Sequence, residues 1–457
     1  MARVASDELG TWPIGKLLVK QAIPAAIGIL VMSLNILVDS IFVGKWIGPM
    51  AIAAINVVLP VSFFIGALGI AIGVGGSSII SRALGQGDRT KAVSVFGNQI
   101  ALTILITVAL VVVGLSYRDV LIPAFGGKGA IFEPAKIYYT IILYGVPFLA
   151  LCMMGNTVIR AEGKPKFAMI AMIVPSVGNL LMDYIFIYLF DWGMQGAAWA
   201  STVGYLSCFV YVAYFFLGKN TEIIGWWKAV GFQWSIVKEI SALGSVTLAR
   251  QAVTSVNYLI LNNVLFDLGG EALVAVYAII GRMLMFALFP VFGVTQGFLP
   301  IAGYNYGAQK FDRVKTSIYT AIKYASLVGT LVFLGLLIFP DFMVNLFLSD
   351  KADLPQSILD INAYVRAHGP NALRWVFAAT PIIALQLIGS AYFQAVGKAI
   401  PAFLLTLSRQ GFFFIPLVLI LPVYWGALGV WLAFPLADLL ATIVTGIALK
   451  REMARLG

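Results

Sequence analysis

Twelve long apolar runs dominate the sequence and leave little of it for structure outside a membrane. A helix needs about 20 mainly apolar residues to cross the hydrocarbon of a bilayer, and each run reaches that length. The runs extend approximately over residues 17–43, 51–80, 92–116, 135–158, 166–190, 194–217, 239–266, 272–299, 316–340, 372–394, 400–422 and 427–449. They predict an all-α polytopic membrane protein with twelve transmembrane helices.

The composition agrees with a surface that faces lipid. Hydrophobic residues occupy 61% of the 457 positions and charged residues only 11%, whereas soluble domains carry about 25% charged residues. The polar start, MARVASDELGTWPIGK, lacks the apolar stretch of a cleavable secretory signal. The two cysteines, Cys152 and Cys208, are too few for a disulfide scaffold or a four-cysteine zinc site, and the single His368 excludes a cluster of histidines.

The basic residues indicate the orientation in the membrane. With the N-terminus placed in the cytoplasm, about 19 Lys and Arg residues fall on inner segments and about seven on outer ones, as the positive-inside rule requires. The inner residues are Arg3, Lys16, Lys20, Arg82, Arg89, Lys91, Arg160, Lys164, Lys166, Lys219, Lys228, Lys238, Lys310, Arg313, Lys315, Lys398, Lys450, Arg451 and Arg455. The outer residues are Lys45, Arg118, Lys128, Lys136, Lys351, Arg366 and Arg374. We therefore predict a multi-pass protein of the prokaryotic inner membrane with both termini in the cytoplasm.

The two halves of the chain resemble each other. Three collinear pairs of segments match at offsets of 230 to 234 residues: 59–64 with 289–294, 155–164 with 389–398, and 193–200 with 426–433. Each half has six predicted spans, so both halves enter the membrane from the same side. Their symmetry axis then runs along the membrane normal, as in transporters built from parallel repeats.

The repeat predicts two lobes joined by a linker. We expect an N-lobe over residues 1–218, a cytoplasmic linker with an interfacial helix over 219–238, and a C-lobe over 239–457. Trp226, Trp227 and Trp234 fall in the linker, where tryptophan side chains suit a membrane–water interface.

Two carboxylates of the first half lie at membrane depth, where an ionised group is costly and therefore a candidate for function. Asp39 lies late in the first span and Asp183 late in the fifth, each with an asparagine four residues earlier on the same helical face, Asn35 and Asn179. Both spans run outward, so the two carboxylates can meet in the outer half of the bilayer. The alternative for Asp39 is simple exposure at the outer surface.

Neutral oxygens near this pair could complete a cation-coupling site. Tyr138, Ser201 and Thr202 fall on neighbouring spans at a similar depth. Two carboxylates with neutral oxygens could bind Na⁺, with Asp39, Asn179 and Asp183 as metal ligands. The same pair could instead share a proton, because like charges in apolar surroundings disfavour double ionisation.

The second half lacks this carboxylate pair. At an offset of about 231 residues, Phe414 corresponds to Asp183 and Gln410 to Asn179. The second half instead carries cations within its spans, at Arg250, Arg282 and Arg409. Asp438 is its clearest intramembrane acid, and an ion pair with Arg409 is one interpretation. The two lobes are therefore expected to differ chemically, with cation coupling confined to the first.

Several function classes find no support. No G-x₄-G-K-[ST] motif is present, so the chain lacks an ATP-driven motor of its own. A repeated selectivity filter or ring of charges, as expected of a channel, is missing, and so is the paired nucleophile and base of an intramembrane hydrolase. The net charge is +10, but the sequence has no cluster of Lys and Arg residues that alternates with aromatic residues, as nucleic-acid binding requires. We expect neither an enzyme nor a cofactor.

Four stretches carry a resemblance to a known family. VDSIFVG (38–44), QGFLPIAGYNYGA (296–308), YFQAVGKAIP (392–401) and GVWLAFPLAD (429–438) resemble the multidrug and toxic compound extrusion (MATE) family, and within it the DinF-like prokaryotic branch. The likeness runs over about residues 14–450. It implies a V-shaped pair of six-helix lobes and secondary antiport, in which H⁺ or Na⁺ moves in while amphipathic, often cationic, drugs or toxic metabolites move out.

The resemblance also implies site residues. The family's first-lobe cation site matches Asp39, Asn179 and Asp183, with Tyr138 at its tyrosine and Ser201 at its threonine. The chain departs from some relatives at Met32 and Asn35, where they carry Gln and Tyr, and the acidic second-lobe ion site of another branch is absent. The candidates that would line the substrate cavity are Met32, Asn35, Asn156, Arg282 and Gln296.

We expect small-molecule substrates, contact with membrane lipids, a monomer and no nucleic-acid partner. The alternative function is a flippase or exporter of a lipid or lipid-linked glycan, because exporters of related architecture exist. Such a protein is expected to have a basic cavity between its lobes. Asp39 and Asp183 argue against a basic cavity, whereas Arg282 and Arg409 argue for one.

Overall fold

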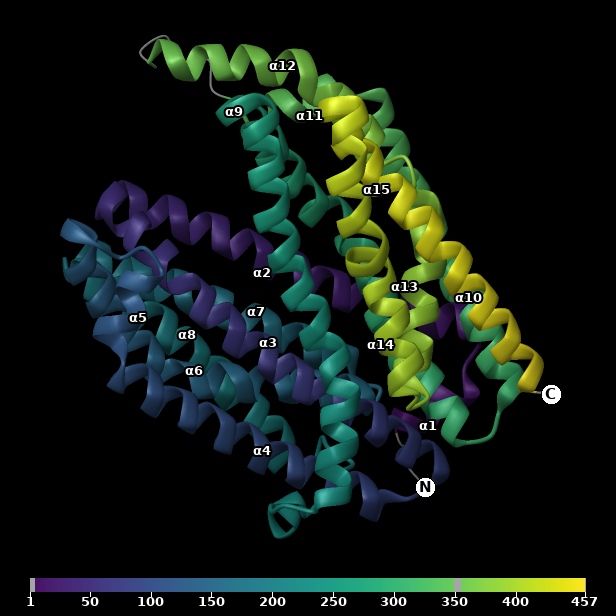
Figure 1. The fold of residues 1–457 in the computed structure, drawn as a ribbon. Coiled ribbons are helices and arrows are strands. Elements are labelled where there is room, and N and C mark those ends of the chain that lie inside the picture. Colours follow the sequence, from purple (N-terminus) through teal and green to yellow (C-terminus); the bar gives the residue numbers. More distant parts are fainter. Residues whose placement is uncertain (1–4, 349–354, 457) are drawn as a thin grey trace.

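The computed structural model describes residues 5–348 and 355–456, and every regular element in these ranges is a helix (Figure 1). Arg3 and Lys351, two of the charges that entered the topology prediction, lie outside the described residues. The helices of the first half are α1 (Ala5–Thr11), α2 (Ile14–Trp46), α3 (Pro49–Gln86), α4 (Arg89–Ser116), α5 (Arg118–Ala124), η1 (Gly129–Ile131), α6 (Phe132–Ala161), α7 (Pro165–Asp183), η2 (Tyr184–Leu189) and α8 (Gly193–Leu217).

The second half begins after a linker that contains the short η3 helix (Trp226–Ala229). Its helices are α9 (Trp234–Gly307), α10 (Phe311–Ile338), α11 (Pro340–Asn345), α12 (Gln356–Val376), α13 (Thr380–Ala395), α14 (Ala399–Leu407), η4 (Ser408–Phe413) and α15 (Phe414–Arg455). Two of these long helices are broken. Gly270 in α9 has a φ of 61° and Gly426 in α15 a φ of 54°, a backbone conformation that glycine adopts without a steric penalty.

The structure contains the twelve spans that the hydropathy predicts. Among the described residues, nine helical segments are long and apolar enough to cross a membrane, and the pair α12–α13, bent by 48°, makes a tenth. Two of the nine, Trp234–Gly307 and Ala399–Arg455, are 74 and 57 residues long, and the breaks at Gly270 and Gly426 divide each into two spans.

The predicted span 372–394 differs from the observed one. It was expected as one span, but α12 ends at Val376 and α13 begins at Thr380 in a direction that differs by 48°. Pro381 lies in the first turn of α13. Because proline has no amide hydrogen and its ring clashes with the carbonyl four residues earlier, the helix cannot continue unbent through residue 377.

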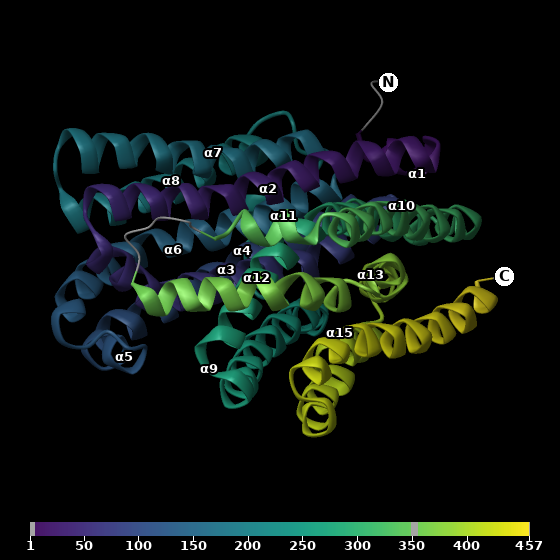
Figure 2. The ribbon, with the colours of Figure 1, turned by 90° about the horizontal axis from the view of Figure 1, so that it is seen from above.

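The helices form two lobes that meet at one end of the molecule and diverge toward the other (Figure 1; Figure 2 from above). We call the end that holds both termini the closed end. One apolar core joins both lobes there and includes Ile80 and Phe298. Farther away the core separates into two clusters, one in each lobe, around Tyr139 and around Leu265.

Two glycines of α9 allow the lobes to approach closely. A Cβ at Gly293 would lie 2.6 Å from the Cβ of Ala26 on α2, and one at Gly297 would lie 2.8 Å from the amide nitrogen of Ala22. Any larger residue would therefore push α2 and α9 apart.

Hydrogen bonds and an ion pair also cross between the lobes at the closed end. Ser78 on α3 donates to the carbonyl oxygen of Gln394 on α13 at 2.6 Å. Arg82 on α3 pairs with Glu239 on α9 at 2.8 Å.

Polar contacts at the same end anchor the N-terminal helix and the linker. The Asn305 amide of α9 donates to the Leu9 carbonyl of α1 at 2.9 Å. The Ser6 hydroxyl donates to Glu222 of the linker at 2.6 Å. The linker in turn reaches the α6–α7 turn, where buried Glu162 accepts hydrogen bonds from the Thr221 hydroxyl and the Glu222 amide, both at 2.7 Å.

The buried Glu162 should make stability depend on pH. Burial raises the pKa of its carboxyl from 4.5 to about 7, although its two hydrogen bonds oppose the shift. Between these values the folded state binds more protons than the unfolded state. Stability should therefore fall as the pH rises from about 4.5 to about 7, by up to about 3 kcal/mol. We expect Glu162→Gln to remove this component of the thermal melt of purified protein, and Glu133→Gln, an exposed control, to retain it. A pH profile that Glu162→Gln leaves unchanged would contradict the assignment.

Candidate functional site

The structure brings the two predicted carboxylates together. Asp39 of α2 and Asp183, the last residue of α7, lie close enough for their charges to interact, on the side away from the closed end. Asp183 is fully buried, and neither of its carboxyl oxygens receives a hydrogen bond from a described residue. Asp39 is partly exposed, so it is not a simple surface residue. Buried negative charge without donors is costly, and a proton or a cation would compensate it.

A chain of neutral polar groups surrounds the pair. The Asn35 amide donates to the Asn179 Oδ1 atom at 3.2 Å, which joins α2 to α7. The Asn179 amide donates to the Ser201 hydroxyl at 3.5 Å, and the Tyr138 hydroxyl lies at 3.5 Å from the same atom. Asn35 and Asn179 each precede a carboxylate by four residues, and the hydrogen bond between them joins the two helices that carry the carboxylates.

Local backbone geometry shapes this site. The helix α7 continues after Asp183 as the π-helical segment η2, and such segments often occur at functional sites. Tyr205 of α8 was missed by sequence reasoning, although it lies close enough to Asp39 for their charges to interact. It is four residues after Ser201, so the same helical-face argument would have found it.

Other predicted residues lie apart from the carboxylates. The Thr202 hydroxyl donates to the Ile141 carbonyl at 3.3 Å. The Asn156 amide donates to the Ala168 carbonyl at 2.6 Å and thereby ties α6 to α7. Met32 is partly buried against the core of the closed end.

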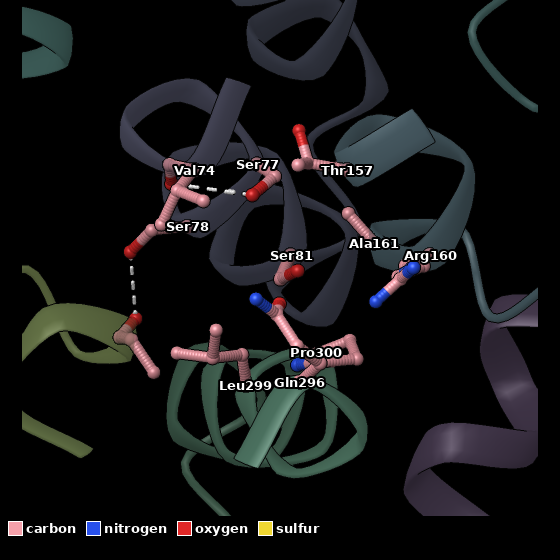
Figure 3. Close-up of a pocket in the computed structure, with 11 residues that line it drawn as sticks. Val74, Ser77, Ser78, Ser81, Thr157, Arg160, Ala161, Gln296, Leu299 and Pro300 are labelled. Atoms are coloured by element: carbon pink, nitrogen blue, oxygen red, sulfur yellow. Dashed lines mark hydrogen bonds between the residues drawn. The ribbon is translucent and has the colours of Figure 1, made fainter. Parts of the chain in front are cut away.

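Gln296 lines a small cavity between the lobes (Figure 3). Ser77 and Ser81 come from α3, Arg160 from α6 and Gln296 from α9. The volume is about 20 Å³, which is enough for a water molecule and too small for a drug.

The second lobe contains a much larger cavity of about 630 Å³. Its lining includes Arg282, Arg409, Gln410, Phe414 and Asp438. The Arg409 Nε atom lies 2.6 Å from the Asp438 Oδ1 atom, which confirms the predicted ion pair within the lobe. Phe414, the counterpart of Asp183, is buried and packs against Phe434 at a ring distance of 4.7 Å.

The described residues contain no group of three or more His, Cys, Asp or Glu side chains that could bind a metal ion. Cys152 and Cys208 form a disulfide between α6 and α8.

Two six-helix lobes with polar groups buried at membrane depth define the class of protein, a multi-pass membrane transporter.

The family follows from the match to a family model. The model named MatE matches residues 24–185 and 247–420, one segment in each lobe. The chain belongs to the MatE family, whose members are transporters and not enzymes, so the resemblance and the twelve-helix, two-lobe fold are confirmed.

Relatives cover almost the whole chain. The multidrug export protein MepA of Staphylococcus aureus (strain N315) is 25% identical over 433 residues, 94% of this chain and 92% of MepA. A multidrug resistance MATE family transporter of the MOP superfamily, solved in an outward-facing conformation, superposes with a TM-score of 0.88 at 27% identity and 98% coverage of both chains. A MATE structure in a bent conformation reaches a TM-score of 0.90 at 26% identity, covering 100% of this chain and 99% of that one.

The ion pair of the second lobe yields a stability prediction. Asp438→Asn leaves the mostly buried Arg409 guanidinium without its partner, which typically costs about 3–5 kcal/mol. We expect a clearly lower melting temperature for Asp438→Asn, and recovery of most of the loss in the double variant Arg409→Met, Asp438→Leu. Additive losses in the double variant would show that the two residues act independently.

Proposed function

We propose that this transporter is a multidrug exporter. It moves amphipathic, often cationic, organic molecules outward in exchange for inward H⁺ or Na⁺. The observation that supports the proposal most strongly is the Asp39–Asp183 pair, which lacks compensating donors. The names of the relatives, multidrug export and multidrug resistance proteins, favour the same substrate class.

The first lobe has the groups that ion coupling needs. Two adjacent carboxylates at membrane depth require positive charge, and a shared proton supplies it in the least space. Na⁺ is the alternative, with Asp39, Asn179 and Asp183 as ligands and the Ser201 and Tyr138 oxygens nearby. Loading either ion removes negative charge that a cationic drug would otherwise use as its counter-charge.

The helix α2 is the proposed moving part. It carries Asn35 and Asp39 in one half, and Pro24 interrupts its hydrogen bonding in the other half. MATE has been solved in a bent and in a straight conformation, so related molecules change shape. In our proposal ion binding favours a bent α2, the first-lobe cavity shrinks, and the drug loses both space and counter-charge.

The remaining features complete the proposal. The positive-inside distribution supports a prokaryotic inner-membrane protein with both termini in the cytoplasm, so the closed end faces the cytoplasm and the structure corresponds to an outward-facing state. The protein works as a monomer, and lipid covers its apolar outer surface.

Asp39→Asn and Asp183→Asn should each abolish export, because the amide keeps the shape of the side chain and removes its ability to titrate. Cells that express each variant should extrude ethidium no faster than cells without the protein, at equal amounts in the membrane. Asp267→Asn, a change at an exposed carboxylate of α9, should retain export. Normal export by Asp39→Asn would refute the paired-carboxylate mechanism.

Coupling should be visible in proteoliposomes with ΔpH and ΔNa⁺ imposed separately. Ethidium transport should respond to one gradient and disappear without it. Because ion and drug compete, ethidium affinity of the purified protein should fall as the pH drops if H⁺ is the coupling ion, or as Na⁺ rises if Na⁺ is. An affinity that ignores both ions would place the exchange outside the first lobe.

A further inference from the structure

Arg282 is an unpaired cation deep in the second lobe. It is exposed in the 630 Å³ cavity, and among the described residues no carboxylate or hydrogen-bond acceptor pairs with it. At about 1.5 Å per residue it lies about 18 Å along α9 from the break at Gly270. The hydrocarbon core is about 30 Å thick, so Arg282 lies near its middle, where an uncompensated charge is costly and indicates function.

We propose that this cavity binds the anionic group of an amphipathic organic acid, with the Arg282 guanidinium as its counter-charge. The proposal rests on the export function proposed above and adds a substrate class, acids and zwitterions with a flat apolar body. It assigns opposite charge preferences to the two lobes.

The other charges of the cavity support a preference for anions. Of the described residues that line the cavity, three are charged, namely Arg282, Arg409 and Asp438. Because Arg409 and Asp438 compensate each other at 2.6 Å, the positive charge of Arg282 remains. A cationic drug would meet repulsion here, whereas a carboxylate would gain a charge-assisted hydrogen bond in a site of low polarity.

The walls fit an aromatic ligand. Tyr258 and Tyr277 contact each other at a ring distance of 5.9 Å, and Phe414 and Phe434 form a second pair, all four at the cavity lining. The volume lies within the range of about 300–1,000 Å³ that is usual for sites of drug-sized molecules. An inorganic anion would leave these apolar walls unused.

The π-helical segment η4 contributes the polar part of the wall. It places the Gln410 carbonyl oxygen at 2.9 Å from the Asn257 amide and the Gln410 Oε1 atom at 3.2 Å from the Thr254 hydroxyl. These bonds tie η4 to the first half of α9, so the cavity wall is braced in the absence of ligand.

A membrane lipid is the less suitable occupant. Lipid phosphates lie at the membrane interface, whereas Arg282 lies near the middle of the hydrocarbon. A headgroup would have to leave the interface to reach it. We therefore assign the site to a soluble amphipathic acid.

The test compares two dyes that differ in one group. Rhodamine 19 carries a free carboxylate on a cationic xanthene, and rhodamine 6G is its ethyl ester. Binding to purified protein in phosphatidylcholine nanodiscs is measured by fluorescence anisotropy. We expect Arg282→Gln to weaken binding of the acid by about tenfold or more, whereas binding of the cationic ester should stay the same or become tighter because the repulsion is removed. Arg282→Lys should recover part of the loss.

Controls separate this proposal from misfolding and from the export mechanism. Arg374→Gln, at an exposed arginine of α12 that does not line the cavity, should bind both dyes normally. Ester binding by Arg282→Gln that is not weaker than in the wild type shows that the variant is folded. If Asp183→Asn does not alter ethidium export, the proposed ion coupling is refuted. The effect of Arg282→Gln on rhodamine 19 binding would still stand.

Four results would overturn the proposal. The wild type could fail to bind rhodamine 19, or Arg282→Gln could weaken both dyes equally or neither. Displacement of rhodamine 19 when phosphatidylglycerol replaces part of the phosphatidylcholine would assign the cavity to lipid headgroups instead.

Discussion

The carboxyl group buried at Asp183 is the constraint on which the rest of this structure depends. Its carboxyl oxygens receive no hydrogen bond from the described residues, and its nearest charged neighbour is another carboxylate, Asp39. Such a pair is tolerable at membrane depth only with a proton or a cation present. The neighbouring amides and hydroxyls are bonded to one another and do not neutralise the pair.

The helix α2 links this charge to the contact between the lobes. Asp39 and Asn35 lie in one half of it, while Ala22 and Ala26 in the other half meet Gly297 and Gly293 of α9. Because the approach at these glycines leaves no free space, a change in the direction of α2 must either carry α9 with it or open the closed end. A local change of charge can thereby become a rearrangement of lobes, which is what the proposed alternating access requires.

The sequence predicts the fold well because lipid forces each span to satisfy its own backbone, so hydropathy alone reports twelve helices. The four-residue spacing of Asn179 and Asp183 likewise predicts a shared face. Spacing along one helix does not indicate which other helix packs against it. Two residues predicted to line the substrate cavity therefore have other surroundings: Asn156 bonds to Ala168, and Gln296 lines the small cavity between the lobes. The break before Thr380 was recognisable from Pro381, whereas the π-helical segments have no comparable local signal.

The duplicated architecture did not duplicate the carboxylate pair, and the reason lies in the neighbours of Phe414. Its ring packs against Phe434, and the nearby carboxylate of Asp438 is compensated by Arg409. Among the described residues that line that lobe's cavity, no uncompensated negative charge remains, so a coupling cation gains nothing by entering it. If one ion-binding pair serves both lobes, ion release must be transmitted to the second lobe mechanically, and the contact of α2 with α9 is one physical route for it.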